Sequence, residues 1–466
     1  MSSQDRYDPN TFSALSYHDG LDDFRAGKDN PRAYLERCLA TIAEREPVVQ
    51  AYAAINETAA RETADASTAR WRAGKPRSSI DGMPVSIKDL LETKDMPTGM
   101  GCAAYAGNFP KRDNAAVWAL RQAGAVILGK TVTAELGGAH PGPTTNPFNE
   151  RCTPGGSSSG CAAAVAARMV PAAIGTQVGG SIIRPAGYCG NVAFKPTQGG
   201  INRGERQATS MSTHGVHAGN VEDMWRVAIE IANRVGGDRG ARGLSGPAMA
   251  PAPVKPARLL VLRTQGWPDL DEVSKRGFGE LLDGLANAGV EIIGREERRS
   301  LEALERALGD ARNVCNSITG WENRWATRNL VDQHPEGVSA RAKAALADAE
   351  TMSVEDYRAA LLAREYAQRC HAALRGVADA IVSLACPGPA HEWLGDQPGQ
   401  PLAPRPTGDA VFNYPSSMLF APAVTVPLMS VGGMPVGVQF FGQQHEDARM
   451  SAHARWALDT LTPVTV

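Results

Sequence analysis

The stretch that decides the fold runs from residue 153 to residue 200 and reads TPGGSSSGCAAAVAARMVPAAIGTQVGGSIIRPAGYCGNVAFKPTQGG. A Gly/Ser loop at 155–160 leads directly into the small side chains of 161–167. Such a loop taken alone is typical of a flexible linker, but the small residues after it predict a closely packed, buried helix. A phosphate-binding loop would need a lysine after Gly160, where Cys161 stands.

A second cluster, Gly179-Gly180-Ser181, lies in the same stretch. Two glycines leave backbone N–H groups bare beside a hydroxyl, an arrangement that can stabilise an oxyanion. An ordinary Gly-Gly turn is the structural alternative. The GxSxG elbow is absent, because Ile183 stands where the second glycine belongs. His214 follows soon after, as does His217, so a Ser/His/Asp triad stays open.

A lysine can replace histidine as the base if burial lowers its pKa enough to leave the amine neutral. Lys88 lies in the otherwise apolar stretch 84–91 and is the best candidate. The alternative is a lysine at a strand end, beside Asp89, whose ammonium reaches solvent.

The order of expected elements favours an α/β fold. A strand at 83–88, a helix at 115–123 stopped by Gly124, and a strand at 125–128 predict parallel pairing. Before them we expect two helices, one capped by Asn30-Pro31 and one at 57–73. After a Gly/Pro/Ala-rich break at 236–256, the expected strands are 258–262, 290–293, 380–384, 423–427 and 436–441, with helix at 278–288 and over most of 300–375.

Composition excludes several classes of protein. The 466 residues carry a formal net charge of -2, so there is no general basic surface for nucleic acid. No apolar run reaches the ~18 residues of a membrane span, and the polar start is unlike a secretory signal. The eight cysteines form no CxxC pair, and no HExxH occurs, which predicts reduced thiols in the cytoplasm and no metal centre.

Lys88, Ser157 and Ser181 together resemble the catalytic triad of the amidase signature family. Four segments carry the resemblance, namely 82–89 (GMPVSIKD), 123–131 (AGAVILGKT, with Glu135 following), 153–197 and 433–439 (GMPVGVQ). The two serines stand 24 positions apart (181 − 157), which is the family's spacing. The resemblance implies one α/β domain over 1–466, with a central mixed sheet covered by helices on both faces.

Within that domain we expect four parts. They are a helical N-terminal segment at about 1–75, a catalytic core at about 76–235, a surface excursion at about 236–257, and a variable pocket region with closing strands at about 258–466.

The resemblance also implies a role for each residue. Ser181 is the nucleophile, Ser157 relays the proton from a cis peptide after Gly156, and Lys88 is the base. The backbone around Val178, Gly179 and Gly180 forms the oxyanion hole. Ser158 orients Lys88 or the relay by hydrogen bonding. No metal or organic cofactor is implied.

The nucleophile segment departs from the commoner family pattern GTDTGGSIRIPA. Gln177 stands where Asp is usual, and Val178 stands where Thr is usual. Ile183 replaces the usual Arg, and Arg184 follows one place late. Because both members of a possible acid–base contact are replaced, a stranded buried charge is not expected. Gln177 can still support the nucleophile loop by accepting and donating hydrogen bonds.

These residues predict a hydrolase of a small amide, with water as second substrate and neither nucleic acid nor membrane as partner; a homodimer stays open. A carbamate or urea-type hydrolase would use the same triad. A glutaminase-type subunit of a tRNA-dependent amidotransferase and a non-catalytic relative are further alternatives. We expect pocket residues from 98–110, 311–330 and 387–420. Residues 411–415 are either pocket wall or core, and three aromatic side chains could line an aryl site: Trp321, Trp325 and Phe412.

Overall fold

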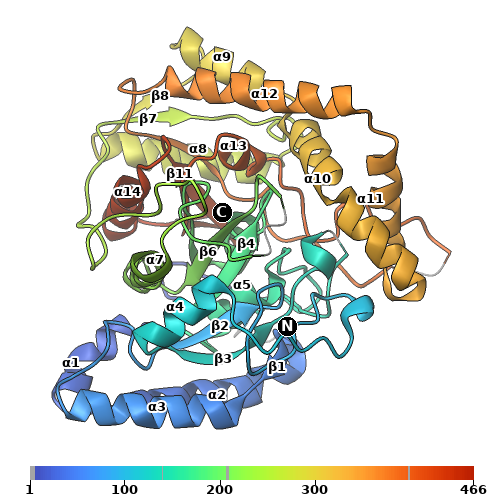
Figure 1. The fold of residues 1–466 in the computed structure, drawn as a ribbon. Helices are drawn as coiled ribbons and strands as arrows, with labels where there is room; N and C mark the ends of the chain where they lie inside the picture. Colours follow the sequence, from blue (N-terminus) through green and yellow to red (C-terminus); the bar gives the residue numbers. More distant parts are fainter. Residues whose placement is uncertain (1–5, 139, 206–208, 397–398) are drawn as a thin grey trace.

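The computed structural model describes residues 6–138, 140–205, 209–396 and 399–466. Over these ranges the strands form one twelve-stranded mixed sheet in the order β1-β3-β2-β4-β6-β5-β10-β11-β9-β7-β8, with β12 paired to β10 (Figure 1). The strands are β1 Tyr52–Ile55, β2 Pro84–Lys88, β3 Val126–Thr131, β4 Ala172–Gln177, β5 Val192–Lys195, β6 Thr213–Ala218, β7 Arg258–Val261, β8 Glu291–Ile293, β9 Ala380–Leu384, β10 Ala423–Val431, β11 Met434–Phe441 and β12 Val464–Thr465.

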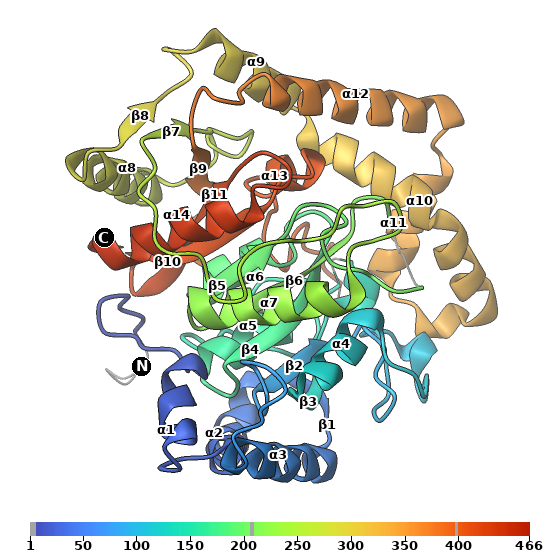
Figure 2. The same ribbon diagram turned by 60° about the vertical axis from the view of Figure 1, so that its left-hand side comes forward.

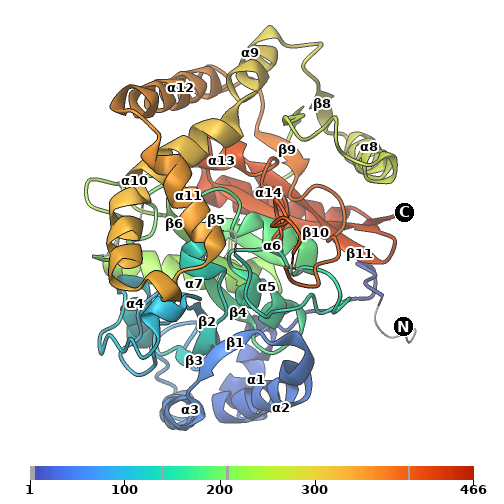
Figure 3. The same ribbon diagram turned by 90° about the vertical axis from the view of Figure 1, so that its right-hand side faces the viewer.

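Helices cover both faces of this sheet, which confirms the expected α/β fold. Side chains of α2, α3 and α5 form one apolar cluster with β3 and β4, whereas α4, α7, α8 and α14 pack on the opposite face (Figure 2). The helices are α1 Leu21–Arg25, α2 Pro31–Val49, α3 Glu57–Arg72, α4 Ala115–Ala123, α5 Ser159–Ala166, α6 Ile183–Cys189, α7 Val221–Val235, α8 Glu272–Asn287, α9 Arg299–Ala307, α10 Ala311–Gln333, α11 Ala340–Glu350, α12 Val354–Ala372, α13 Tyr414–Met418 and α14 Asp447–Thr460. Helices α9 to α12 lie at the periphery (Figures 1 and 3).

The strand–helix–strand unit expected from the sequence is present. Strand β2 pairs in parallel with β3 and also with β4. Helix α4 is capped by the Asn114 side chain and ends at Gly124, whose φ of 90° suits glycine. Parallel pairing brings the ends of β2 and β4 to one edge of the sheet, where Lys88 and Gln177 close the two strands.

Two of the expected elements have other bounds in the structure, for identifiable reasons. Strand β10 does not end at Pro427 but continues to Val431. Proline has no backbone N–H to donate, and Pro427 lies where the pairing with β11 shifts register between Val426 and Met429, so no regular hydrogen bond of the ladder is lost there. Helix α8 begins at Glu272 rather than near residue 278, because the Asp271 side chain accepts a hydrogen bond from the Ser274 backbone N–H and caps it.

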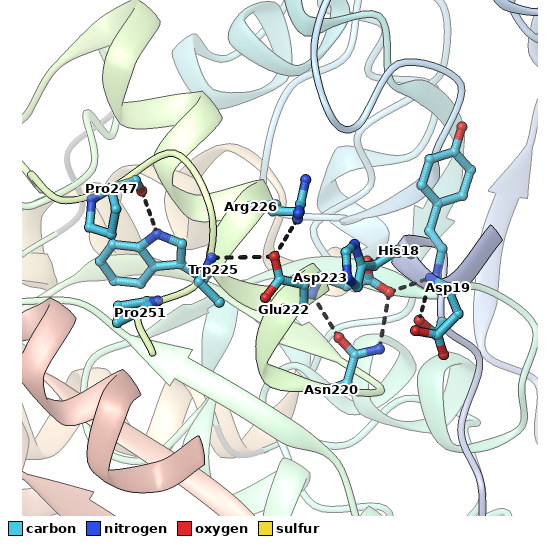
Figure 4. A network of polar contacts seen from close by, with 12 residues as sticks. His18, Asp19, Asn220, Glu222, Asp223, Trp225, Arg226, Pro247 and Pro251 are labelled. Atoms are coloured by element: carbon cyan, nitrogen blue, oxygen red, sulfur yellow. Dashed lines mark hydrogen bonds and ion pairs between the residues drawn. The ribbon is translucent and has the colours of Figure 1, made fainter. Parts of the chain in front are cut away.

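The surface excursion at 236–257 contains neither a helix nor a strand and is tied down at α7 (Figure 4). Trp225 donates its ring N–H to the Pro247 carbonyl, 2.8 Å away. On the other side of α7, the Asp223 carboxylate accepts from the backbone N–H groups of Tyr17 and His18, at 2.7 and 3.0 Å. Helix α7 therefore anchors both the segment around Tyr17 and the excursion. Among the described residues, no helix is long and apolar enough to cross a membrane.

Candidate active site

Lys88 ends β2 with a side chain that is 0% exposed. Its Nζ lies 2.7 Å from Ser157 Oγ, 3.0 Å from Thr176 Oγ1 and 3.3 Å from the Thr176 carbonyl oxygen. Burial lowers the pKa of this amine to about 7, and the charge of Arg184 acts in the same direction. At neutral pH a large share of the molecules therefore carries Lys88 as an uncharged amine.

The neighbouring carboxylate does not counter this effect. Asp89 Oδ1 lies 2.7 Å from the ammonium of Lys130, a residue of β3. That pairing leaves Lys88 without an ion pair among the residues the structure describes. The alternative of a lysine that reaches solvent beside Asp89 is wrong, because Lys88 points into the protein.

Ser157 follows a cis peptide bond after Gly156, as expected. Its carbonyl accepts from the Ala134 backbone N–H at 3.0 Å. The next residue, Ser158, donates its backbone N–H to the Ser181 carbonyl oxygen at 3.3 Å. The loop that carries Ser157, the expected relay, thus lies directly against the backbone of Ser181, the expected nucleophile.

Ser158 does not contact Lys88 or Ser157 in the way expected. Its hydroxyl lies 3.3 Å from the Thr176 carbonyl oxygen and accepts from the Thr176 N–H at 3.4 Å. Ser158 therefore acts on Lys88 through Thr176, a residue that the motifs did not single out. A hydroxyl side chain at the next-to-last position of β4, three residues before the Gly-Gly-Ser cluster, was the only local signal.

Gln177 supports the nucleophile loop as expected. Its Oε1 accepts from the backbone N–H groups of Ile182 and Ile183, at 2.8 and 3.0 Å. These are orphan donors at the start of α6, so the amide acts as a helix cap. Its Nε2 donates to Ser417 Oγ at 3.1 Å. The loop 178–181 is therefore fastened at both ends.

Arg184, one place beyond the family's usual position, is also used. The side chain is buried, and its Nη2 donates to the Gly156 carbonyl at 2.7 Å and to Thr407 Oγ1 at 3.2 Å. The first bond joins α6 to the loop that holds Ser157. Although the arginine stands one position later than in the commoner pattern, it still connects these two segments.

Backbone N–H groups beside Ser181 are free to bind a ligand. In the described part of the chain, the amides of Val178, Gly179, Gly180 and Ser181 have no hydrogen-bond acceptor. A Cβ on Gly180 would lie 2.5 Å from Asn413 Oδ1, and one on Gly179 would lie 2.8 Å from the Tyr414 ring. Glycine is required at both positions by this close approach, and the bare amides are suited to an oxyanion.

The two histidines do not form a triad with either serine. His214 and His217 are buried, and burial lowers both pKa values to about 3. Within the described ranges neither ring makes a hydrogen bond, including to Ser157 or Ser181. They are neutral at neutral pH, and Lys88, not a histidine, is the titratable side chain that the structure places on the Ser157 hydroxyl.

A cavity of about 1160 Å³ opens beside the site and reaches Thr176 and His214. Residues from 98–110 and 311–330 line it as expected, but none of the described residues in 387–420 does; the lining includes Met100, Tyr105, Leu136, Glu322, Trp325 and Leu330. Trp321 instead stacks on Tyr357, and Phe412 is 0% exposed in the core. Only Trp325 of the three expected aromatic residues lies on its wall.

Comparison with known proteins identifies related chains. A family model described as Amidase matches residues 33–450, which confirms the resemblance drawn from the motifs. A glutamyl-tRNA(Gln) amidotransferase subunit of Geobacter metallireducens is 29% identical over 462 residues, covering 89% of this chain and 91% of that protein. A crystal structure of an amidase has a TM-score of 0.81 at 28% identity, covering 96% of this chain and all of that one. The fold, at 21% identity, also matches 6-aminohexanoate cyclic dimer hydrolase, with a TM-score of 0.80 and coverage of 96% and 98%.

We expect Gly180→Ala to lower kcat by ~10²-fold or more, because the added methyl group meets Asn413 Oδ1 and displaces the oxyanion amides. Gly279→Ala is the matched control, since nothing lies within 4 Å of its Cβ position in α8. Steady-state kinetics with a chromogenic anilide measure the difference. Equal kcat values for the two variants would contradict this account of the loop.

Proposed function

Because this chain belongs to the Amidase family and is an enzyme that acts on C–N bonds, we propose that it hydrolyses a small-molecule amide through an acyl-enzyme on Ser181. The 2.7 Å contact between Lys88 Nζ and Ser157 Oγ carries the proposal. A neutral amine has two N–H donors and one lone pair. Both donors can be used by Thr176, at Oγ1 and the carbonyl, so the lone pair is left for the Ser157 hydroxyl.

The proposed acylation begins with attack of Ser181 Oγ on the amide carbonyl carbon. The Ser181 proton passes to Ser157 Oγ as the Ser157 proton passes to Lys88 Nζ. A C–O bond forms, and the carbonyl π electrons move onto oxygen, where the amides of 178–181 can receive the negative charge. Collapse of this intermediate breaks the C–N bond, and the proton returns from Lys88 through Ser157 to the leaving nitrogen.

Deacylation repeats the same transfers with water in place of Ser181. Water loses a proton through Ser157 to Lys88 and bonds to the acyl carbon. Ser181 then leaves and regains its proton by the same route, so the products are a carboxylic acid and an amine. These steps use only residues of this chain, and the described residues contain no group of three or more His, Cys, Asp or Glu placed to hold a metal ion.

The cavity supports a substrate larger than a bare amide group. Apolar side chains, including Leu136, Trp325 and Leu330, line it together with charged ones such as Lys94, Arg112 and Glu322, and Thr176 and His214 also lie on its wall. A volume of about 1160 Å³ lies near the upper end of ordinary small-ligand sites. We propose a cytoplasmic setting as well, because all eight cysteines are unpaired.

Ser181→Ala should lower turnover of a chromogenic anilide at least ~10³-fold, because no other hydroxyl takes over the attack. Intact-mass spectrometry should show an acyl adduct on quenched wild-type enzyme and none on the variant. Ser159→Ala is a suitable control, since its hydroxyl bonds the Val132 carbonyl away from the proposed chemistry. An acyl adduct on Ser181→Ala would overturn the proposed mechanism.

The pH dependence of acylation should follow Lys88. The base acts when it is neutral, so kcat/KM should rise about tenfold per pH unit below 7 and level off above it. In Lys88→Ala, the residual rate should lose this inflection. The substrate should carry no group that titrates in this range. If kcat/KM of Lys88→Ala still changed with pH around the same midpoint, the inflection would belong to another group.

A second function is favoured by one observation, the similarity to a glutamyl-tRNA(Gln) amidotransferase subunit. A glutaminase role would need partner subunits, whereas our main proposal requires none. We expect the isolated chain to hydrolyse anilides or alkyl amides faster than free glutamine in a screen that also contains carbamates and ureas. A preference for glutamine would favour the amidotransferase role. A preference for carbamates or ureas would replace amides as the proposed substrate class and would leave the proposed roles of Lys88, Ser157 and Ser181 unchanged.

A further inference from the structure

Ser417 lies on α13, 236 positions beyond Ser181 (417 − 181), and its side chain is buried. Its Oγ donates to the Gly179 carbonyl at 2.8 Å and accepts from Gln177 Nε2 at 3.1 Å. A serine hydroxyl has one hydrogen to give, and here it is given to Gly179. The hydroxyl thus joins two residues of the nucleophile loop.

The bond to the Gly179 carbonyl fixes more than one atom. The Gly179 C=O and the Gly180 N–H belong to the same planar peptide unit, and in a trans peptide they point in opposite directions. Gly156–Ser157 is the one cis bond among the described residues, so the unit after Gly179 is trans. Holding the carbonyl toward α13 therefore turns the Gly180 N–H away from α13, and that amide has no acceptor in the described chain.

We propose that Ser417 is a positioning residue for the oxyanion hole, which holds the Gly179–Gly180 peptide so that the Gly180 amide awaits the developing oxyanion. The inference rests on the proposed acyl transfer at Ser181. Ser417 touches neither substrate nor reacting atoms and acts through the peptide unit. Donors fixed before the reaction cost no reorganisation when the negative charge forms.

The neighbours of Ser417 oppose other orientations of this peptide. Asn413 Oδ1 and the Tyr414 ring occupy the positions that a Cβ would take on Gly180 and Gly179. Tyr414 is itself held by a 3.2 Å bond from its hydroxyl to Asn316 Oδ1 on α10. Residues at the start of α13 thus pack directly on Gly179 and Gly180 and hold this part of the loop from the same side as Ser417.

Ser417→Ala tests the proposal. Without the hydroxyl, the Gly179 carbonyl loses its anchor, and we expect kcat to fall ~10- to 100-fold with KM changed less than about twofold, since the amide acts only in the transition state. Ser416→Ala is the matched control, because that serine is equally buried on the same helix and bonds the Asn413 carbonyl. Its kcat should stay within about twofold of wild type.

A second variant and a second measurement separate positioning from folding. Ser417→Cys leaves no cavity, adds little volume and weakens the donor, so it should fold and still lower kcat. Affinity for a trifluoromethyl ketone, which forms an oxyanion-like adduct on Ser181, should fall in both Ser417 variants in parallel with kcat. The pH midpoint near 7 should not move, because Lys88 keeps its contacts.

The outcomes distinguish the positioning role of Ser417 from the proposed acyl transfer at Ser181, on which it rests. Wild-type kcat and ketone affinity in the Ser417 variants, with Ser181→Ala inactive, would overturn the positioning role and leave the acyl-enzyme intact. An equal loss in Ser416→Ala would also overturn it, since the effect would then belong to the helix. Turnover by Ser181→Ala would instead overturn the proposed function itself.

Discussion

The site depends on burying a lysine amine without a counter-ion. Removing an ammonium from water is costly, and burial of Lys88 without a paired carboxylate lowers its pKa to about 7, as the proposed base requires. The adjacent Asp89 would reverse this effect if it faced Lys88, because an opposite charge favours the ammonium. Strand pairing prevents that, since β3 brings Lys130 to Asp89 and satisfies the carboxylate elsewhere.

Close packing then brings Ser157 to the lysine. Helix α5, which begins just after Ser157 and Ser158, is built from small side chains and is buried along its whole length. A Cβ on Gly160 would lie 2.2 Å from the Ala51 carbonyl oxygen, so only glycine allows this helix to approach β1 and β3 so closely. The small residues that stand out in the sequence thus allow the 2.7 Å contact between Lys88 and Ser157 on which the proposed proton relay depends.

Local sequence patterns encode part of this site. Lys88 in its apolar strand, the cis peptide at Ser157 and the supporting amide of Gln177 were all predictable from the sequence and its motifs. Thr176 and Ser417 were not, because Thr176 belongs to a strand that the sequence pattern did not reveal, and Ser417 lies 238 and 240 positions from its partners Gly179 and Gln177. Strands β4 and β6 were missed because glycine, alanine and histidine give them no alternating apolar pattern. Phe412 could not be assigned from sequence, since buried core and pocket wall share the same composition.

The replacement of the usual Asp by Gln177 makes sense once Ser417 is included. Because Oε1 accepts from the start of α6, the NH₂ group must face Ser417 and donate to it. The hydroxyl hydrogen of Ser417 is then free to go to the Gly179 carbonyl. A carboxylate at 177 could only accept, so it would compete with Gly179 for that hydrogen and add a negative charge near the proposed oxyanion site. Gln177 and Ser417 therefore form one hydrogen-bonded chain. The bonds that Gln177 accepts fix the bond that it donates to Ser417, and this in turn fixes the bond that Ser417 donates to the Gly179 carbonyl, two residues before Ser181.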